Sequence, residues 1–306
     1  MLFPVPPRPV VIGYAPNYNG DLAAFSETID YARLTHVNIA FENPANDDGD
    51  LSFDPQDATL VTKAHAAGVK VLVSIGGGGA SGNTELMKRY FWLTSPTRRA
   101  GFVRKVADYV TAHDLDGLDV DLEGPSINGD YGAFVRDLGV ALSAKGKLLT
   151  AALSKGYGGD QVPTEALKAF DYVSVMAYDA TGPWAPNRPG PHSSLEFAKD
   201  AAQYWVKRGL PKSKLVLGVP FYGYGFTGGK SDEWPYRRIV STYPGAEGAD
   251  VTGNTIYYNG AATIRAKGRY IVTQGFAGAM IWSLDSDATG DKALLAVLDS
   301  ALRMGH

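Results

Sequence analysis

The chain has 306 residues, of which 45% are hydrophobic and 20% are charged, so it holds enough apolar material for the core of one large domain or two small ones. The formal net charge of -3 comes without a block of basic residues, which argues against nucleic acid or an anionic membrane surface as a partner. Cysteine is absent, which excludes disulfide bonds, thiol catalysis and cysteine-ligated metal sites.

The first segment, residues 1–9, is rich in proline and predicts an extended arm. It lacks a basic stretch followed by a long apolar run, so it does not have the pattern of a signal peptide or of a membrane span.

Beyond this arm, eight apolar runs rich in β-branched residues predict buried strands. Several of them stop at a turn composition; the run that ends at Phe41, for example, continues into Glu42–Gly49. The predicted strands cover residues 10–14, 36–41, 69–74, 116–123, 148–153, 172–179, 214–222 and 278–284.

The segments between these strands carry helix signals. Asp54-Pro55 and Ser95-Pro96 each pair a capping side chain with a proline of the first turn, and Gly68 is placed to end the first of these helices. Apolar residues recur at helical spacing after Ser95 and again after residue 131. The predicted helices begin at residues 54 and 95 and cover 131–142, 195–208 and 292–302.

The alternation of strands and helical segments, with no composition break and no internal repeat, predicts a single α/β domain over residues 1–306, a (β/α)8 barrel. An open doubly wound sheet is the alternative. The barrel is favoured because the unusual residues fall at the C-terminal ends of strands, which share one rim in a barrel. These residues are Tyr14, Phe41, Ser74, Glu123, Met176 to Asp179, Tyr222 and Trp282.

The stretch from Asp116 to Glu123 mixes four acids with apolar residues. Alternate side chains of a strand share a face, so Asp119, Asp121 and Glu123 point one way, whereas Asp116 faces away from them and fixes the entry turn of the strand. Three like charges on a half-buried strand repel one another, so at least one carboxyl group should keep its proton at neutral pH. That pattern is typical of catalysis, although calcium binding or a solvated edge strand would also explain it.

Other catalytic motifs lack support. Residues 223–231 end in Gly-Lys-Ser, but Tyr224 replaces the first glycine of a phosphate-binding loop and no helical segment follows. The five histidines lack metal-ligand spacing, so no metal site is expected. No G-x-S-x-G elbow occurs, which removes support for a serine hydrolase.

The acidic stretch, Asp116-Gly117-Leu118-Asp119-Val120-Asp121-Leu122-Glu123, resembles the D-G-x-D-x-D-x-E signature of family 18 glycoside hydrolases, the chitinases and endo-β-N-acetylglucosaminidases. Four further segments at strand ends are similar to elements of that family, so the resemblance spans nearly the whole chain. They are Ser74–Gly77, Met176–Asp179, Pro220–Gly223 and Trp282.

The resemblance implies a retaining hydrolysis in which the acetamido group of the substrate is the nucleophile, an exception to the scheme of two catalytic carboxylates. Glu123 would protonate the glycosidic oxygen and then act as a base toward water. Asp121 would stabilise the acetamido nitrogen, and Asp119 would share a proton with Asp121. Tyr178 would hydrogen-bond the acetamido oxygen. No cofactor is implied.

The resemblance also implies a carbohydrate-binding pocket. Trp282 would form the floor beneath the reacting sugar, because a flat indole stacks on the apolar face of a pyranose ring. The other implied substrate-binding residues are Tyr14, Phe41, Gly77, Met176, Asp179 and Tyr222, although Tyr14, Phe41 and Met176 would equally serve as barrel filling. The expected partner is chitin, a chitooligosaccharide or an N-glycan, bound by a monomeric protein that is secreted or otherwise extracytoplasmic.

Three positions depart from the family pattern. Gly79 stands where many chitinases have an aromatic residue, Tyr224 stands where they have arginine, and Gly124 replaces an aromatic residue directly after Glu123. Residues 227–255 are too few for the full α+β insertion of deep-cleft members, so an open groove and endo-type cleavage are expected.

Two alternative functions remain, namely cleavage of N-glycan cores and sugar binding without catalysis, as in a lectin. The presence of Glu123 favours catalysis over the lectin.

Overall fold

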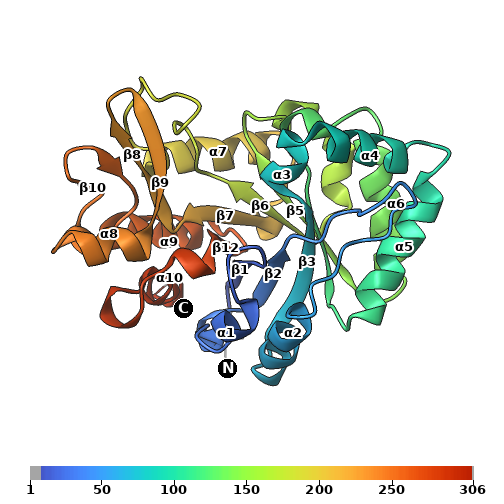
Figure 1. Ribbon diagram of the computed structural model, residues 1–306, viewed down its shortest axis with the longest axis horizontal. Coiled ribbons are helices and arrows are strands. Elements are labelled where there is room, and N and C mark those ends of the chain that lie inside the picture. The colour runs from blue at the N-terminus through green and yellow to red at the C-terminus, as the bar shows by residue number, and fades with distance from the viewer. Residues whose placement is uncertain (1–7, 305–306) are drawn as a thin grey trace, which may run out of the picture.

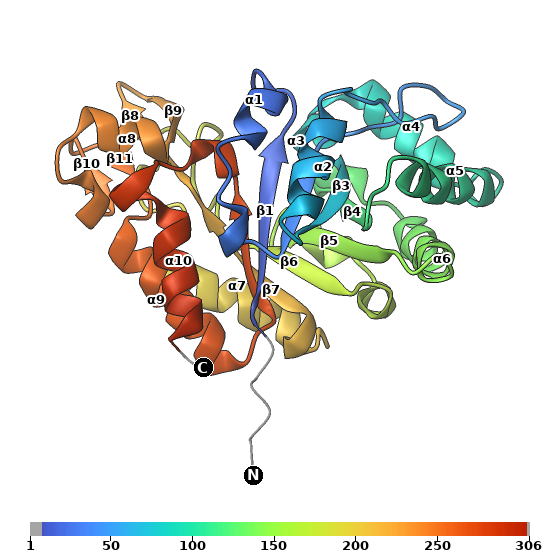
Figure 2. The same ribbon diagram turned by 90° about the horizontal axis from the view of Figure 1, so that it is seen from below.

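The computed structural model describes residues 8–304, so most of the predicted proline-rich arm, residues 1–7, lies outside the described part of the chain. Eight parallel strands form a closed barrel in the order β1-β12-β7-β6-β5-β4-β3-β2 (Figure 1, Figure 2). The barrel strands are β1 (Val10–Pro16), β2 (His36–Ala40), β3 (Lys70–Gly76), β4 (Gly117–Asp121), β5 (Leu148–Ser154), β6 (Tyr172–Met176), β7 (Leu215–Pro220) and β12 (Gly278–Trp282).

The first and last strands close the barrel, since Val11 pairs with Ala279 and Gly13 with Ile281. The predicted (β/α)8 barrel is therefore confirmed, and the alternative of an open doubly wound sheet is wrong. The strands read as continuous apolar runs because both their faces are covered, one by the barrel interior and the other by helices. The fourth and sixth strands end earlier than predicted, at Asp121 and Met176.

Helices surround the barrel (Figure 2). Two of them begin later than predicted because Asp54 and Ser95 form turns that precede the helices; the Asp54 carboxylate accepts the Gln56 N–H, and the Ser95 carbonyl accepts the Arg99 N–H. No helix within residues 8–304 is both long and apolar enough to cross a membrane. The helices around the barrel are α1 (Leu22–Ser26), α2 (Asp57–Ala66), α3 (Gly77–Gly82), α4 (Thr84–Thr94), α5 (Arg99–Ala112), α6 (Tyr131–Ser143), α7 (Leu195–Lys207), α9 (Ala261–Gln274) and α10 (Leu294–Arg303).

Four of these helices, α1, α3, α4 and α9, are not among the predicted ones. The sequence of α3 contains only glycine, alanine and serine, and glycine is the weakest helix former after proline. The α4 helix does carry a start signal, because the Asn83 side chain accepts the backbone N–H groups of Glu85 and Leu86. Tertiary packing, rather than propensity, therefore decides the helical state of α3.

The two faces of β4 have opposite characters. Leu118 and Val120 are fully buried in the core between the barrel and its helices, whereas Asp119 and Asp121 point into the barrel. Asp116 faces outward, as predicted: its Oδ2 accepts the Val71 backbone N–H at 2.8 Å and lies 2.8 Å from the Nε2 of His65.

The segment after β7 folds into a small antiparallel sheet with the strand order β10-β11-β8-β9. It begins at Tyr222, five residues before the predicted excursion, because β8 follows β7 after a single residue and the two strands read as one apolar run. The sheet and α8 lie on the side of the barrel opposite to α5 and α6 (Figure 1). The elements are β8 (Tyr222–Thr227), β9 (Lys230–Pro235), α8 (Tyr236–Thr242), β10 (Val251–Thr252) and β11 (Ile256–Tyr257).

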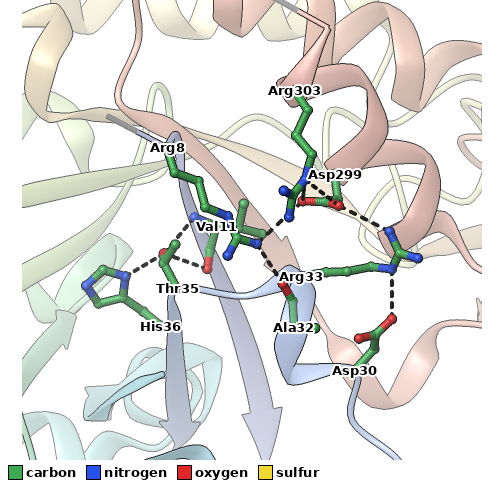
Figure 3. Close-up of polar contacts among 9 residues, drawn as sticks. All are labelled: Arg8, Val11, Asp30, Ala32, Arg33, Thr35, His36, Asp299 and Arg303. Carbon is green, nitrogen blue, oxygen red and sulfur yellow. Dashed lines mark hydrogen bonds and ion pairs between the residues drawn. The ribbon is translucent and has the colours of Figure 1, made fainter. Parts of the chain in front are cut away.

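A cluster of ionic contacts joins the two ends of the chain (Figure 3). The carboxylate of Asp299 on α10 is buried and accepts hydrogen bonds from Arg303 at 2.9 Å, Arg33 at 3.1 Å and Arg8 at 3.5 Å. Arg8 precedes β1 and Arg33 lies in a short 3-10 helix, η1 (Tyr31–Arg33), before β2, so this cluster lies at the N-terminal end of the barrel strands.

Candidate active site

Asp119 lies at the centre of a hydrogen-bond network inside the barrel. Its Oδ2 accepts the hydroxyl groups of Tyr14 and Ser74, both at 2.7 Å, and its Oδ1 accepts that of Thr150 at 2.5 Å. Burial raises the pKa of the Asp119 carboxyl above its usual range, and the three hydroxyl donors oppose this rise because they stabilise the ionised form. The network holds Asp119 rigidly beneath the rim.

Asp121 lies two residues nearer the rim and is also buried. Its Oδ1 has no hydrogen-bond partner among residues 8–304. Burial raises the pKa of Asp121 well above its usual range, and the charges of Glu123 and Asp119 raise it further. These causes favour the protonated form of Asp121 in neutral solution.

Glu123 lies just beyond the end of β4, where it precedes a short 3-10 helix, η2 (Gly124–Ser126). The residue is only partly buried, in contrast to Asp119 and Asp121. Burial raises the pKa of Glu123 to about 7, and the charge of Asp179 adds to the rise. The outermost carboxyl of the line is therefore both within reach of a ligand and half protonated near neutral pH.

Asp179 follows β6 with a backbone φ of +66°, a left-handed conformation that is uncommon for residues other than glycine. Its Oδ1 accepts the hydroxyl groups of Tyr222 at 2.5 Å and Tyr224 at 3.0 Å. The buried ring of His192 lies against this carboxylate, with Nδ1 3.4 Å from Oδ1 and Nε2 3.2 Å from the Tyr222 carbonyl oxygen. Three side chains thus fix the direction of a carboxylate that is 40% exposed.

Aromatic rings form the wall beside the carboxyl groups. The ring of Trp282 lies 5.3 Å from that of Tyr14 and 5.8 Å from that of Phe41, and Tyr18 stacks on Phe41 at 6.5 Å. Gly77 provides the space for Phe41, because a Cβ at that position would lie 2.5 Å from the phenyl carbons. Gly77 therefore contributes to the wall by lacking a side chain, which leaves room for the Phe41 ring.

Tyr178 and Met176 occupy the C-terminal end of β6. Both are partly buried and pack against the small apolar cluster inside the barrel, which contains Tyr14 and Met280. The Tyr178 hydroxyl has a weak contact with the Met280 sulfur at 3.8 Å, and burial raises the pKa of this phenol well above its usual range. The hydroxyl therefore stays protonated and is able to donate a hydrogen bond.

The structure thus brings every predicted site residue to the C-terminal end of the barrel or to the interior beneath it. Reasoning from the sequence did not assign His192 to the site, and it marked Tyr224 only as a departure from the family pattern. His192 lies in a loop, thirteen residues after Asp179, and no local pattern links the two. Among residues 8–304, no three histidine or acidic side chains are grouped so that they could hold a metal ion.

Comparison with known proteins identifies the family. The model of the glycosyl hydrolases family 18 matches residues 10–287. The chain belongs to this family. It is similar to a family 18 chitinase from the chitin utilization locus of Flavobacterium johnsoniae, with a TM-score of 0.90 and 37% identity over 96% of this chain and 94% of that one.

Two other similar proteins differ from each other in what their names describe. The Endochitinase of Manduca sexta is 27% identical over 340 residues, which cover 85% of this chain. This chain spans 60% of that relative, and less than two thirds of other curated relatives that it matches. The chitinase-like agglutinin of Robinia pseudoacacia has a TM-score of 0.80 at 24% identity, over 95% of this chain and 98% of that one, which shows a common fold.

Proposed function

We propose that the chain hydrolyses β-1,4 linkages between N-acetylglucosamine residues in chitin or chitooligosaccharides, with retention of the anomeric configuration. The observation that carries this proposal is the line of carboxyl groups along β4, which ends at the partly exposed Glu123 with its pKa of about 7. A carboxyl group that is half protonated near neutral pH is suited to act first as an acid and then as a base.

In the first step the protonated Glu123 gives its proton to the glycosidic oxygen while the bond from that oxygen to the anomeric carbon breaks. The acetamido oxygen of the same sugar forms a bond to the anomeric carbon from the opposite face, which gives a cyclic oxazolinium. Asp121 turns toward the acetamido N–H and accepts it, and the proton that Asp121 holds at rest is shared with Asp119. The positive charge of the oxazolinium is stabilised by the Asp121 carboxylate.

In the second step Glu123, now ionised, removes a proton from a water molecule. The water oxygen attacks the anomeric carbon, the bond to the acetamido oxygen breaks, and Glu123 is protonated again. Two inversions at the same carbon leave the configuration unchanged. The charge of Asp179, which raises the pKa of Glu123, favours the return of the proton.

The side chains around Glu123 support the binding of an N-acetylated sugar. The Tyr178 hydroxyl is protonated and has only a weak contact within the protein, so it is available to the acetamido oxygen. The ring of Trp282, held by Tyr14 and Phe41, provides a flat apolar surface for the pyranose ring. Asp179 offers an exposed and rigidly held acceptor for a sugar hydroxyl.

We also propose endo-type cleavage. The insertion between β7 and α9 is one small sheet and one short helix, which favours a groove that is open at both ends, and an endochitinase is among the relatives. Release mainly of disaccharides from a chain end would contradict this proposal. The alternative substrate is the core of an N-glycan. The alternative to an enzyme is a lectin, which binds sugars without hydrolysing them; the similar protein from Robinia pseudoacacia is named an agglutinin.

The test compares products from chitooligosaccharides with products from a high-mannose glycoprotein. We expect the wild-type chain to cut the oligosaccharides internally and Glu123→Gln to lower kcat by at least about a hundredfold. Oligomers of glucosamine, which lack the acetamido nucleophile, should be cut poorly by the wild type. The matched control is Glu165→Gln, at an acid with 79% of its side chain exposed, which should keep full activity.

Each result decides between the alternatives. Cleavage of the glycoprotein alone would replace chitin by N-glycan cores as the substrate. Oligosaccharide binding with no turnover by the wild type would make the protein a lectin. Full activity of Glu123→Gln would refute the assignment of the acid.

A further inference from the structure

We propose that Tyr157, on the loop after β5, is a substrate-binding residue that forms an aromatic wall beside Glu123. This inference rests on the proposed function, because it assumes that a sugar chain enters the site. Tyr157 lies outside the signature segments and 34 positions from Glu123 in the sequence.

The ring of Tyr157 occupies the space directly over Gly124, the residue that follows Glu123. A Cβ at Gly124 would lie 2.2 Å from the Cζ of Tyr157 and 2.4 Å from its Cε1. The backbone N–H of Gly124 also donates to the Tyr157 carbonyl at 3.3 Å. The absence of a side chain at position 124 is therefore what allows an aromatic ring from the loop after β5 to lie beside the candidate acid.

The loop that carries Tyr157 is held in place at both ends. The Ser154 hydroxyl donates to the Tyr157 carbonyl at 2.8 Å. Gly158 has a φ of +76°, and a Cβ there would lie 2.6 Å from the Gly124 nitrogen, so the two segments are in close contact. The guanidinium of Arg208, at the end of α7, donates to the carbonyl oxygens of Gly159 and Val162. Because the loop is fixed before a ligand binds, little conformational entropy is lost when its side chains make a contact.

The side chain is nevertheless exposed. Tyr157 keeps 54% of its surface in contact with solvent. A rigidly supported, exposed aromatic ring beside a catalytic acid offers an apolar surface to a pyranose ring. Since Trp282 provides such a surface at the end of β12, Tyr157 adds a second one at the ends of β4 and β5.

The experiment measures the affinity of chitopentaose by calorimetry in the Glu123→Gln background, where hydrolysis does not interfere. We expect Tyr157→Ala to raise Kd about tenfold, whereas Tyr157→Phe stays within about twofold because the ring, and not the hydroxyl, makes the contact. The matched control is Phe53→Ala, which removes a ring that is 43% exposed and stacked on His113 at the end of α5. This control should leave Kd unchanged.

Two further readouts separate binding from folding. In the otherwise native chain, Tyr157→Ala should raise KM about tenfold and change kcat by much less, and the midpoint of thermal unfolding should stay within about 2 °C. An unchanged Kd for Tyr157→Ala, or a loss as large for Tyr157→Phe, would overturn the inference. Absence of chitopentaose binding by Glu123→Gln itself would overturn the proposed substrate and this inference with it, so the two failures are distinguishable.

Discussion

Glu123 is a carboxylic acid like Asp119 and Asp121 on β4, but its surroundings differ from theirs. Asp119 is held by three hydroxyl donors, and Glu123 emerges at the rim. Asp121 is buried, and one of its oxygens has no hydrogen-bond partner within the described part of the chain. Alternation along a strand predicts that these side chains share a face. It does not predict which one remains accessible, because the strand ends at Asp121 and only the tertiary structure sets the depth of each residue.

Because the pKa of Glu123 is raised, we expect both the activity and the stability contributed by this group to fall as the pH rises through about 7. The proposed first step needs the acid form of Glu123, so we expect kcat/KM to fall as the pH rises through about 7. The folded chain also holds this proton more tightly than the unfolded chain, in which the carboxyl titrates near 4.5. The stability that this group contributes is therefore complete below about pH 4.5 and is lost as the pH rises through about 7.

In Glu123→Gln, the stability should not be lost in this way as the pH rises, because the amide does not titrate. Unfolding in urea should show equal stabilities near pH 4, and the variant should become more stable than the wild type by up to about 3 kcal/mol near pH 8. The surface variant Glu165→Gln should show no such divergence. A difference between Glu123→Gln and the wild type that does not change with pH would contradict the assigned pKa.

At the scale of elements, the loop between β6 and α7 is fixed to α9 by a buried lysine. The ammonium of Lys267 on α9 donates to the Ser193 carbonyl at 2.8 Å, to the Ser193 hydroxyl at 2.6 Å and to Asn259 at 2.6 Å. Ser193 in turn donates to the Ala177 carbonyl at 2.6 Å, next to Tyr178. The cluster therefore joins the loop that carries Asp179 to the helix behind it.

Lys267→Met should lower the free energy of unfolding by about 3 kcal/mol, because it leaves the buried acceptors on Ser193 and Asn259 unsatisfied. Burial lowers the pKa of Lys267 to about 7, so this group disfavours folding below pH 7 and the penalty disappears as the pH rises toward its unfolded value near 10.5. Chemical denaturation measures both effects. The control Lys168→Met, at a side chain with 79% exposure, should change stability by less than about 0.5 kcal/mol, and an equal loss in both variants would refute the role of the cluster.

At the scale of the whole molecule, closure of the barrel requires the two ends of the chain to meet. The pairing of β1 with β12 provides the backbone part of this closure, and the cluster around Asp299 provides a side-chain part (Figure 3). Arg8, Arg33 and Arg303 come from three segments that are distant in the sequence, and they share one buried carboxylate. Arg303 lies on the same helix as Asp299, whereas Arg8 and Arg33 reach this carboxylate only when the barrel is closed.

Asp299→Ala should lower the free energy of unfolding by about 2 kcal/mol, since three arginines lose their common partner; their partial exposure keeps the loss below that of a fully buried ion pair. Asp30→Ala, which removes an exposed partner of Arg33, should cost less than about 0.5 kcal/mol. Thermal and urea unfolding measure both, while kcat/KM at low temperature should remain that of the wild type. An Asp299→Ala variant as stable as Asp30→Ala would show that the cluster does not support closure.

The sequence by itself determined the barrel, the strand that carries the acids and the residues that gather at its rim. These features follow from local signals, namely continuous apolar runs, strand alternation and the signature from Asp116 to Glu123. The tertiary structure alone decided which acid is exposed, that His192 and Tyr224 hold Asp179, and that Tyr157 lies over Gly124. These contacts join residues from different loops, and their geometry depends on where the closed barrel places each strand end, which no local pattern of residues encodes.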